Sequence, residues 1–340
     1  MPQTDNHTQD SSIEQQPHSD VFIQKIFRKE KERYQSKGYG LVFATLIALS
    51  FLFGVPYFAQ LYWPSILAWA EEKGLDYFYT HLYIGTFLHN LCHGVGNLVY
   101  WTFYHFEFDF IERYKSNDLP WPWYSDREAW RTLCFKSIFV LLMNANFIIP
   151  VVLSFLAAVG LEEVHTMAVE DLPDAQTLFL SLLFFMLVED FVFYMTHRLL
   201  HWRVIYPYIH KMHHSHASVV GIGAEYAHPI EFIFGNMLPT IVGPALLGYK
   251  CHLVTLLAWY VVRFTENLDA HSGYDFSWSP FRLIPLSGGA DYHDFHHAAN
   301  VGNYSSLFSI WDTVWNTNSA YYEAKAKAES SDNSPKVKSE

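Results

Sequence analysis

Long apolar runs recur along the first three quarters of the chain. A helix needs about 20 mainly apolar residues to cross a bilayer. Runs of this kind cover residues 38–70, 77–106 and 137–161, and a fourth begins at Ala175. No charged side chain interrupts the first run, although Pro56 and Pro64 predict that its helix ends near Phe58. The pattern therefore predicts four transmembrane helices.

A fifth apolar region, residues 232–262, is interrupted by Pro239, Pro244 and Lys250. Because interior prolines break or kink helices, a membrane hairpin is favoured over one continuous span. The composition agrees, since 51% of the residues are hydrophobic and 18% aromatic while only 16% are charged. We therefore expect an all-α integral membrane protein with about four transmembrane helices plus a membrane hairpin.

Basic residues are distributed unevenly between the loops that connect these segments. Six of them lie between Lys25 and Lys37, and five lie in the loop at residues 107–136. Only Lys73 follows the first span, and residues 162–174 contain none. Cytosolic loops carry the excess of Lys and Arg, so the N-terminus, the 107–136 loop and everything after the fourth span are expected on the cytosolic face.

Three histidine clusters follow the fourth apolar run. They are His197-x-x-x-His201, His210-x-x-His213-His214 and His293-x-x-His296-His297. Residues three and four apart share one face of a helix, so each cluster is expected to direct its imidazoles to one spot. If the hairpin returns to its starting side, all three clusters meet in one cytosolic helical cap.

The type and number of these side chains narrow the choice of metal ion. Neutral imidazole suits iron, zinc, copper and nickel, whereas closed structural zinc sites usually include cysteine. None of the three cysteines, Cys92, Cys134 and Cys251, lies inside a cluster, and eight histidines suffice for two ions. A pair of redox-active ions in a nitrogen shell indicates oxygen chemistry, with iron favoured as the metal.

Neither end of the chain is predicted to be part of the folded region. Residues 1 to about 20 are polar and are not expected to act as a cleavable signal peptide. Residues 1–37 are expected to form a partly disordered cytosolic segment. Residues 321–340 are rich in Ala, Lys, Glu and Ser and are expected to form a disordered cytosolic tail. Lys336 and Lys338 resemble a dilysine retrieval signal of endoplasmic reticulum membrane proteins, but an ordinary lysine-rich tail explains them equally well.

Charge and motif content exclude two classes of function. The formal net charge of -12 argues against nucleic-acid binding, which needs a basic surface. No glycine-rich nucleotide-binding motif is present, because Gly221-Ile-Gly223 leads into Glu225 rather than a third glycine. Electrons for oxygen chemistry must therefore come from another protein.

The segment at 175–320 resembles the fatty acid hydroxylase and sterol desaturase superfamily of membrane di-iron proteins, and within it the C-4 methylsterol oxidases. The resemblance rests on the three histidine clusters and on the phrases Ala224-Glu-Tyr-Ala-His228-Pro229, His271-Ser-Gly-Tyr-Asp275, Gly302-Asn-Tyr304 and Trp311-Asp312. Residues 38–174 match only as a pattern of hydrophobic spans with their loops. The catalytic region is thus expected to be the segment at 175–320.

The resemblance implies an enzyme that oxidises the 4α-methyl group of 4-methyl sterols stepwise to the carboxylate. It also implies two irons per chain, O2 as co-substrate, and electrons from NAD(P)H through cytochrome b5 and its reductase. Other enzymes of sterol C-4 demethylation are candidate partners, and the expected location is the endoplasmic reticulum membrane with both termini in the cytosol.

Two alternatives stay open. The same metal site serves sterol C-5 desaturases, sterol side-chain hydroxylases and fatty acyl hydroxylases, which differ from a C-4 oxidase only in pocket shape. A zinc-stabilised, sterol-binding membrane protein without catalysis is the alternative from a different class. Metal identity measured together with activity separates these possibilities.

Two further histidines are candidate ligands. The resemblance implies that His271 completes the metal shell. His228 is either a ligand or a residue that fixes a turn through hydrogen bonds, and its spacing from Glu225 is also found in soluble carboxylate di-iron bundles. A second Glu-x-x-His motif of that type is missing.

Ligating imidazoles normally donate their second N–H to a carboxylate or carbonyl. Asp190, two helical turns before His197, and Asp294, inside the third cluster, are predicted to be such partners, and Glu189 is a weaker candidate. Acidic side chains at a membrane edge are costly, which suggests a role.

Other positions are not assigned to the metal. His89 and His93 form another HxxxH pair on the second apolar run, and we interpret them as interhelical hydrogen-bonding groups. His216 is interpreted as a loop histidine, and Tyr292 stands where relatives often carry a histidine.

Overall fold

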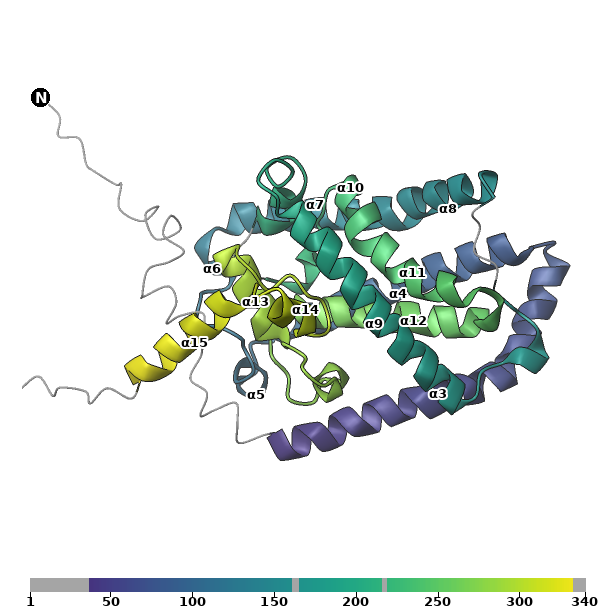
Figure 1. Ribbon diagram of the computed structural model, residues 1–340, viewed down its shortest axis with the longest axis horizontal. Helices are drawn as coiled ribbons and strands as arrows, with labels where there is room; N and C mark the ends of the chain where they lie inside the picture. Colours follow the sequence, from purple (N-terminus) through teal and green to yellow (C-terminus); the bar gives the residue numbers. More distant parts are fainter. Residues whose placement is uncertain (1–36, 161–164, 216–218, 333–340) are drawn as a thin grey trace, which may run out of the picture.

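The computed structural model describes residues 37–160, 165–215 and 219–332, and it is built of helices (Figure 1). Within these ranges there is no strand, only the isolated bridges Lys115 to Tyr274 and Thr166 to His252. The all-α prediction is therefore confirmed. The N-terminal segment, His216 and the lysine pair near the C-terminus lie outside the described residues.

Six long helical segments run side by side and form the body of the molecule. They are α3 (Lys37–Glu72), α4 (Tyr77–Phe106), α7 (Arg127–Met143) continued through the π-turn η1 (Asn144–Ile148) into α8 (Ile149–Ala158), α9 (Ala175–Leu200), α10 (Pro229–Glu231) continued through the π-turn η5 (Phe232–Met237) into α11 (Leu238–Leu247), and α12 (Leu253–Ala270). Helix α9 packs on α11, and α4 packs on α12.

Four of these segments are long and apolar enough to cross a membrane. They cover Gly38–Glu72, Arg127–Ala158, Ala175–Leu200 and Pro229–Lys250. Large apolar side chains such as Phe43, Phe139 and Phe155 are more than half exposed along them, as expected for surfaces that face lipid. The protein is therefore a multi-pass membrane protein.

The first helix differs from its prediction. Helix α3 continues through Pro56 and Pro64 to Glu72 instead of ending near Phe58. Membrane helices tolerate proline because local adjustments and neighbouring side chains satisfy the freed backbone groups. Proline is therefore a weaker stop signal here than in a soluble protein.

Helix α4 has the predicted bounds of the second run, but it is not among the four candidate spans. The reason lies in its buried side chains, which are mostly polar and include Thr80, His81, His89 and His93. This helix therefore brings polar groups into the interior between apolar segments.

The region at 232–262 forms the predicted hairpin, but the chain does not turn at the prolines. Pro239 and Pro244 lie within α11, and the turn begins at Gly248, whose φ of 51° suits glycine. His252 then caps α12, because its Nδ1 accepts a hydrogen bond from the backbone N–H of Val254 at 3.0 Å. Helix α12 consequently returns to the end at which α10 begins.

Short helices gather at this end and form a cap, seen around α13 in Figure 1. They are η3 (His210–Ser215), η4 (Gly221–Gly223), η7 (Pro280–Leu283), α13 (Ala290–Ala299), α14 (Ile310–Val314) and α15 (Ser319–Asp332). The hydroxyl of Tyr104, at the end of α4, donates to the carbonyl of Ser272 at 2.7 Å and accepts from the N–H of Gly221 at 3.1 Å. This one side chain joins the end of α4 to η4 and to the segment after α12.

The prediction of a disordered tail from residue 321 is wrong for its first part. Helix α15 includes Ser319–Asp332, and its Tyr321 is buried with its ring 5.0 Å from that of Tyr292 and 5.4 Å from that of Phe295. Only one face, with Tyr321 and Ala324, is apolar enough to pack on α13. The polar composition of the segment therefore comes from the exposed faces of α15, which packs on α13 by its apolar face.

Candidate metal centre

Nine histidines converge in the cap as two groups. The first group contains His197, His201, His210, His214 and His296. The second contains His213, His271, His293 and His297. Within each group, one nitrogen from every side chain lies within 4.8 Å of all the others. All eight cluster histidines and His271 are thus brought together by the fold.

The clusters do not each point to one spot, contrary to the expectation from spacing. On α13, His293 and His297 lie four residues apart and face the second group, whereas the intervening His296 faces the first. The segment η3 divides in the same way, with His213 in the second group. Adjacent histidines on a helix diverge by roughly 100°, so each HxxHH motif supplies both groups.

Hydrogen bonds fix the tautomers of four rings. The Nδ1 atoms of His197 and His271 donate to the carbonyls of Tyr304 at 2.9 Å and Asn267 at 2.8 Å. The Nδ1 of His296 donates to the carbonyl of Gly302 in the same way. Because these acceptors are oxygens, each ring carries its proton on Nδ1 and a lone pair on Nε2.

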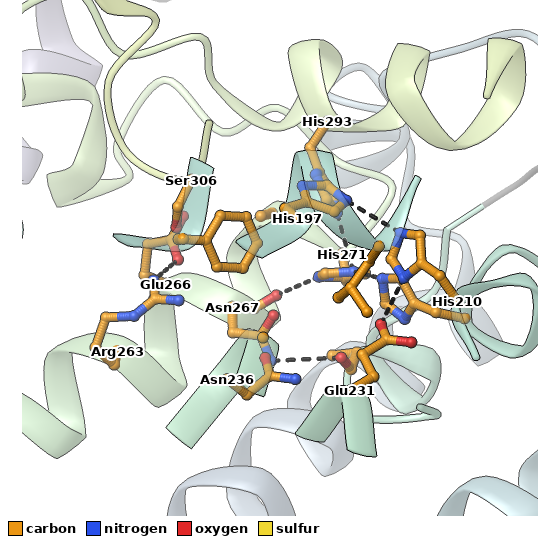
Figure 2. Close-up of a pocket in the computed structure, with 16 residues that line it drawn as sticks. His197, His210, Glu231, Asn236, Arg263, Glu266, Asn267, His271, His293 and Ser306 are labelled. Carbon is orange, nitrogen blue, oxygen red and sulfur yellow. Dashed lines mark hydrogen bonds and ion pairs between the residues drawn. The ribbon is translucent and has the colours of Figure 1, made fainter. Parts of the chain in front are cut away.

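The fourth anchored ring belongs to His210, whose Nδ1 lies 2.8 Å from the carboxylate of Glu231. Figure 2 shows His210 and Glu231 beside His197, His271 and His293. Sequence reasoning did not identify Glu231 as a partner. It could have been found by the criterion used for Asp190, since Glu231 is an acidic residue at the start of an apolar run.

The Nε2 atoms of the first group face one another. His210 Nε2 lies 3.1 Å from that of His197 and 3.0 Å from that of His201, and His296 Nε2 lies 3.1 Å from those of His201 and His214. The lone pairs of His197 and His210 would repel at this separation unless a cation lay between them. The donor set therefore fits a metal ion.

These separations also indicate coordination geometry. Two ligands about 2.1 Å from an ion lie about 3.0 Å apart when they are at right angles and about 3.4 Å apart in a tetrahedron. The separations of His210 Nε2 from the Nε2 atoms of His197 and His201, 3.1 and 3.0 Å, are close to the right-angle value, and the five nitrogens of the first group would together hold one ion. In the second group, His271 Nε2 lies 3.0 Å from His293 Nε2 and 3.3 Å from His213 Nε2.

Burial keeps these rings in the form that binds metal. Desolvation, and then repulsion by neighbouring imidazoles, lowers the pKa of His210, His213 and His214 well below the usual value. The same two causes, in the same order, lower the pKa of His293 and His297. The imidazoles are therefore neutral at pH 7, as metal coordination requires.

Among the described residues, none of the three predicted carboxylate partners has an imidazole as its hydrogen-bond or ion-pair partner. Asp190 accepts instead from the backbone N–H groups of Ser306, Leu307 and Phe308 at 3.0, 2.7 and 3.0 Å. These residues follow Tyr304, whose carbonyl holds His197. Three parallel N–H donors satisfy a buried carboxylate better than one imidazole does. By holding the 304–308 segment, Asp190 positions the ring of His197 indirectly.

Glu189 and Asp294 also connect separate elements of the fold instead of orienting histidines. Glu189 forms an ion pair with Arg263 of α12 at 3.0 Å. Asp294 accepts from the hydroxyl of Ser116 at 2.6 Å and from the amide of Asn117, which ties α13 to the loop after α5 (Asp109–Glu112). Both predictions of direct contact were wrong because sequence spacing does not reveal tertiary partners.

His228 and the pair on α4 lie apart from the two groups. His228 caps α10, and its Nδ1 accepts from the N–H of Ile230 at 3.2 Å, so the alternative of a turn-fixing residue describes its position. His89 lies 2.9 Å from the carboxylate of Glu225 in the loop after η4. The prediction of an interhelical hydrogen bond is therefore wrong for His89, because its partner is a carboxylate in a loop.

Two adjoining cavities lead from the histidines into the membrane part. The first is lined by members of both groups together with Asn236, Arg263 and Asn267, as Figure 2 shows. The second shares those three residues and continues between α4, α8, α11 and α12 along mainly apolar side chains, among them Leu82, Leu153, Phe232, Ile241 and Phe264. The two cavities thus place apolar side chains close to the nitrogens of the histidine groups.

Comparisons with known proteins agree with this site. The fatty acid hydroxylase family model matches residues 182–317. A provisionally named methylsterol monooxygenase from Dictyostelium discoideum is 36% identical over 273 residues, which cover 79% of this chain and 93% of that protein. The chain belongs to the fatty acid hydroxylase family.

Other relatives match shorter stretches of the chain. Methylsterol monooxygenase 2-2 of Arabidopsis thaliana is 44% identical over 164 residues, 47% of this chain and 60% of that protein. A very-long-chain aldehyde decarbonylase of Oryza sativa is 45% identical over 158 residues, 46% of this chain and 58% of that protein. No solved structure matches the chain. The similarity to the methylsterol monooxygenases shows that this protein is an oxidoreductase of that kind.

Proposed function

We propose that this chain oxidises the 4α-methyl group of 4-methyl sterols stepwise, through alcohol and aldehyde, to the carboxylate. The proposal rests above all on two groups of converging imidazoles at the end of an apolar cavity. Relatives named methylsterol monooxygenase support the sterol substrate. Two iron ions held by the nine imidazoles would supply the O2 activation that attack on an unactivated methyl group requires.

The residues of the chain have distinct parts in this reaction. Carbonyls and Glu231 hold four of the imidazoles by their Nδ1 atoms, and burial excludes bulk water from the groups. Asn236 and Asn267 line both cavities, where they can hydrogen-bond the hydroxyl group next to the reacting methyl. The apolar walls of the second cavity then hold the sterol rings.

Electrons would come from NAD(P)H through cytochrome b5 and its reductase. This part of the proposal is supported by the absence of a glycine-rich nucleotide-binding motif from the sequence. The reaction consumes one O2 and two electrons at each oxidation step. The acidic net charge of -12 does not exclude such a partner, because docking depends on local charges.

We further propose an endoplasmic reticulum location with the cap and both termini in the cytosol. The start of α3 packs against η7 of the cap, and the basic 107–136 loop begins at the cap end of α4. A tag at the C-terminus should be digested by protease added to sealed microsomes. Protection of the tag until detergent is added would contradict this orientation.

The reaction is tested with membranes that contain the full chain. They are incubated with a 4,4-dimethyl sterol, NAD(P)H and O2, and the sterols are analysed by mass spectrometry. We expect 4α-hydroxymethyl and 4α-carboxy sterols with the unmodified chain and with His105→Ala, an exposed histidine outside the groups, but not with His213→Ala. A new ring double bond or side-chain hydroxyl would refute the C-4 assignment and leave an oxidising metal site in place.

A second candidate reaction is conversion of a long-chain aldehyde, favoured by the similarity to the aldehyde decarbonylases of Oryza sativa. The same membranes supplied with a very-long-chain aldehyde distinguish it, because a shortened hydrocarbon would then form instead of oxidised sterol. Tightly bound zinc with neither product would indicate a sterol-binding protein without catalysis.

A further inference from the structure

A third set of metal-binding side chains lies outside the two histidine groups. His89 and His93 are four residues apart on one face of α4, and Glu225 approaches them from the loop after η4. The three side chains are almost completely buried, with exposed fractions of 1%, 1% and 5%. The proposed sterol oxidation uses none of them.

Their contacts differ from those of an ordinary histidine–carboxylate pair. One oxygen of Glu225, Oε1, lies 2.9 Å from His89 Nε2 and 3.0 Å from His93 Nε2. His89 Nε2 is aligned for a hydrogen bond, but His93 Nε2 is not, and it has no hydrogen-bond partner among the described residues. Buried polar atoms without partners are costly, so the three atoms converge at a point that a cation would satisfy.

The donor set itself is selective. Two imidazoles and one carboxylate bind catalytic zinc and non-haem iron(II), and they leave coordination positions open. Ligands at right angles about 2.1 Å from such an ion lie about 3.0 Å apart, which matches the two separations at Glu225. Helical spacing already places the two imidazoles on one face.

The surroundings show where the open positions would point. The ring of Phe264 packs against both imidazoles, with ring centres 4.9 Å from His89 and 5.6 Å from His93. His89 and Glu225 also line the apolar cavity between α4, α8, α11 and α12. An ion bound here would therefore present a free position to the cavity.

We propose that His89, His93 and Glu225 bind a third divalent transition-metal ion, zinc or iron(II), whose free position takes a water molecule or an oxygen atom of the cavity's occupant. The three ligands take no part in the oxidation steps proposed above, although the site opens on the same cavity. It accounts for a buried carboxylate next to two imidazoles in an otherwise apolar wall.

Metal analysis of the purified full-length chain tests this site. After loading with zinc and removal of unbound ions, we expect three metal ions per chain, and two in Glu225→Gln and in His93→Asn. The matched control is His81→Gln, a buried histidine on the same helix that bonds Tyr260 instead, and it should retain three. Two ions in the unmodified chain, with no change in either variant, would overturn the proposal.

A second measurement covers the case in which a variant fails to fold. Anomalous diffraction from crystals of the zinc-loaded, unmodified chain should give a peak between His93 and Glu225, and a map without it would refute the site. In His213→Ala this peak should persist while the density at the second histidine group falls. Failure of the proposed sterol oxidation would leave the third peak in place, so the two proposals fail separately.

Discussion

The two histidine groups differ in how many ligands they hold and in how firmly the rings are anchored. The first has five imidazoles, and the Nδ1 atoms of three of them, His197, His210 and His296, donate to oxygen. The second has four, and among the described residues only His271 has such an anchor. The first group therefore offers an ion more ligands, on more firmly held rings, than the second group does.

A metal site that uses oxygen must both retain its ions and leave positions free for oxygen, and the two histidine groups differ in how well they suit each requirement. A saturated centre can hold its ion through repeated changes of charge, whereas exogenous oxygen and substrate need free positions. Both groups contribute to the lining of the first cavity, but the four-membered group has more positions to offer. Substitutions should therefore have unequal effects in the two groups.

The largest effect is expected for His297→Ala in the four-membered group. Only three imidazoles would remain, so the second group should hold its ion more weakly. Sterol oxidation should fall by more than about 100-fold, a larger loss than that expected for an outer hydrogen bond. Metal content and product formation are measured together. A variant that kept its full metal content would remove the basis for treating this group as the weaker one.

A smaller loss is expected for His201→Ala in the five-membered group. Four imidazoles remain, three of them anchored, so this centre should keep its ion at a moderate excess of metal. Product formation should persist at a reduced rate, measured beside His297→Ala under identical loading. Equal loss of metal in both variants would show that ligand number does not distinguish the centres.

Removing an anchor tests rigidity separately from ligand number. Glu231→Gln keeps the shape of the side chain but weakens its bond to His210, so metal affinity of the first group should fall by about 10–100-fold. Competition with a chelator measures this change. The control is Glu128→Gln, an exposed position on α7 whose substitution should leave affinity as it was.

The smallest effect on metal is expected for Asp190→Asn. One oxygen still accepts the N–H groups of residues 306–308, but the charge-assisted part of these bonds is lost, which costs about 1–3 kcal/mol of stability. Thermal unfolding in detergent should begin at a lower temperature with metal content unchanged. Loss of metal without a change in unfolding would instead assign Asp190 directly to the centre.

The sequence predicted the features that depend on local pattern. The helix at 77–106 and the all-α architecture follow from apolar run lengths. The hairpin was predicted from Pro239, Pro244 and Lys250, although its turn begins at Gly248. The extension of α3 past Pro56 could not be predicted with rules for soluble helices, because neighbouring groups satisfy the backbone in a membrane. The folded start of the tail was missed because only one face of α15 is apolar.

The sequence predicted which histidines form the site, but not how they divide between the two groups. Residue type and spacing identified the eight cluster histidines, and the family resemblance added His271. How the HxxHH motifs divide between the groups depends on tertiary packing of η3 and α13. The contacts of Glu231 with His210 and of Glu225 with His89 join positions 21 and 136 residues apart, beyond the reach of any local spacing rule.

The division of η3 and α13 between the two groups links the binding of one ion to that of the other. An ion in the first group would hold Nε2 of His296 and so further restrain the helix that also carries His293 and His297. The second ion then binds to a segment whose conformational entropy has already been lost, so it binds more tightly. The half-loaded chain is consequently disfavoured, and metallation should follow a sigmoidal curve, with chains either empty or complete in both histidine groups.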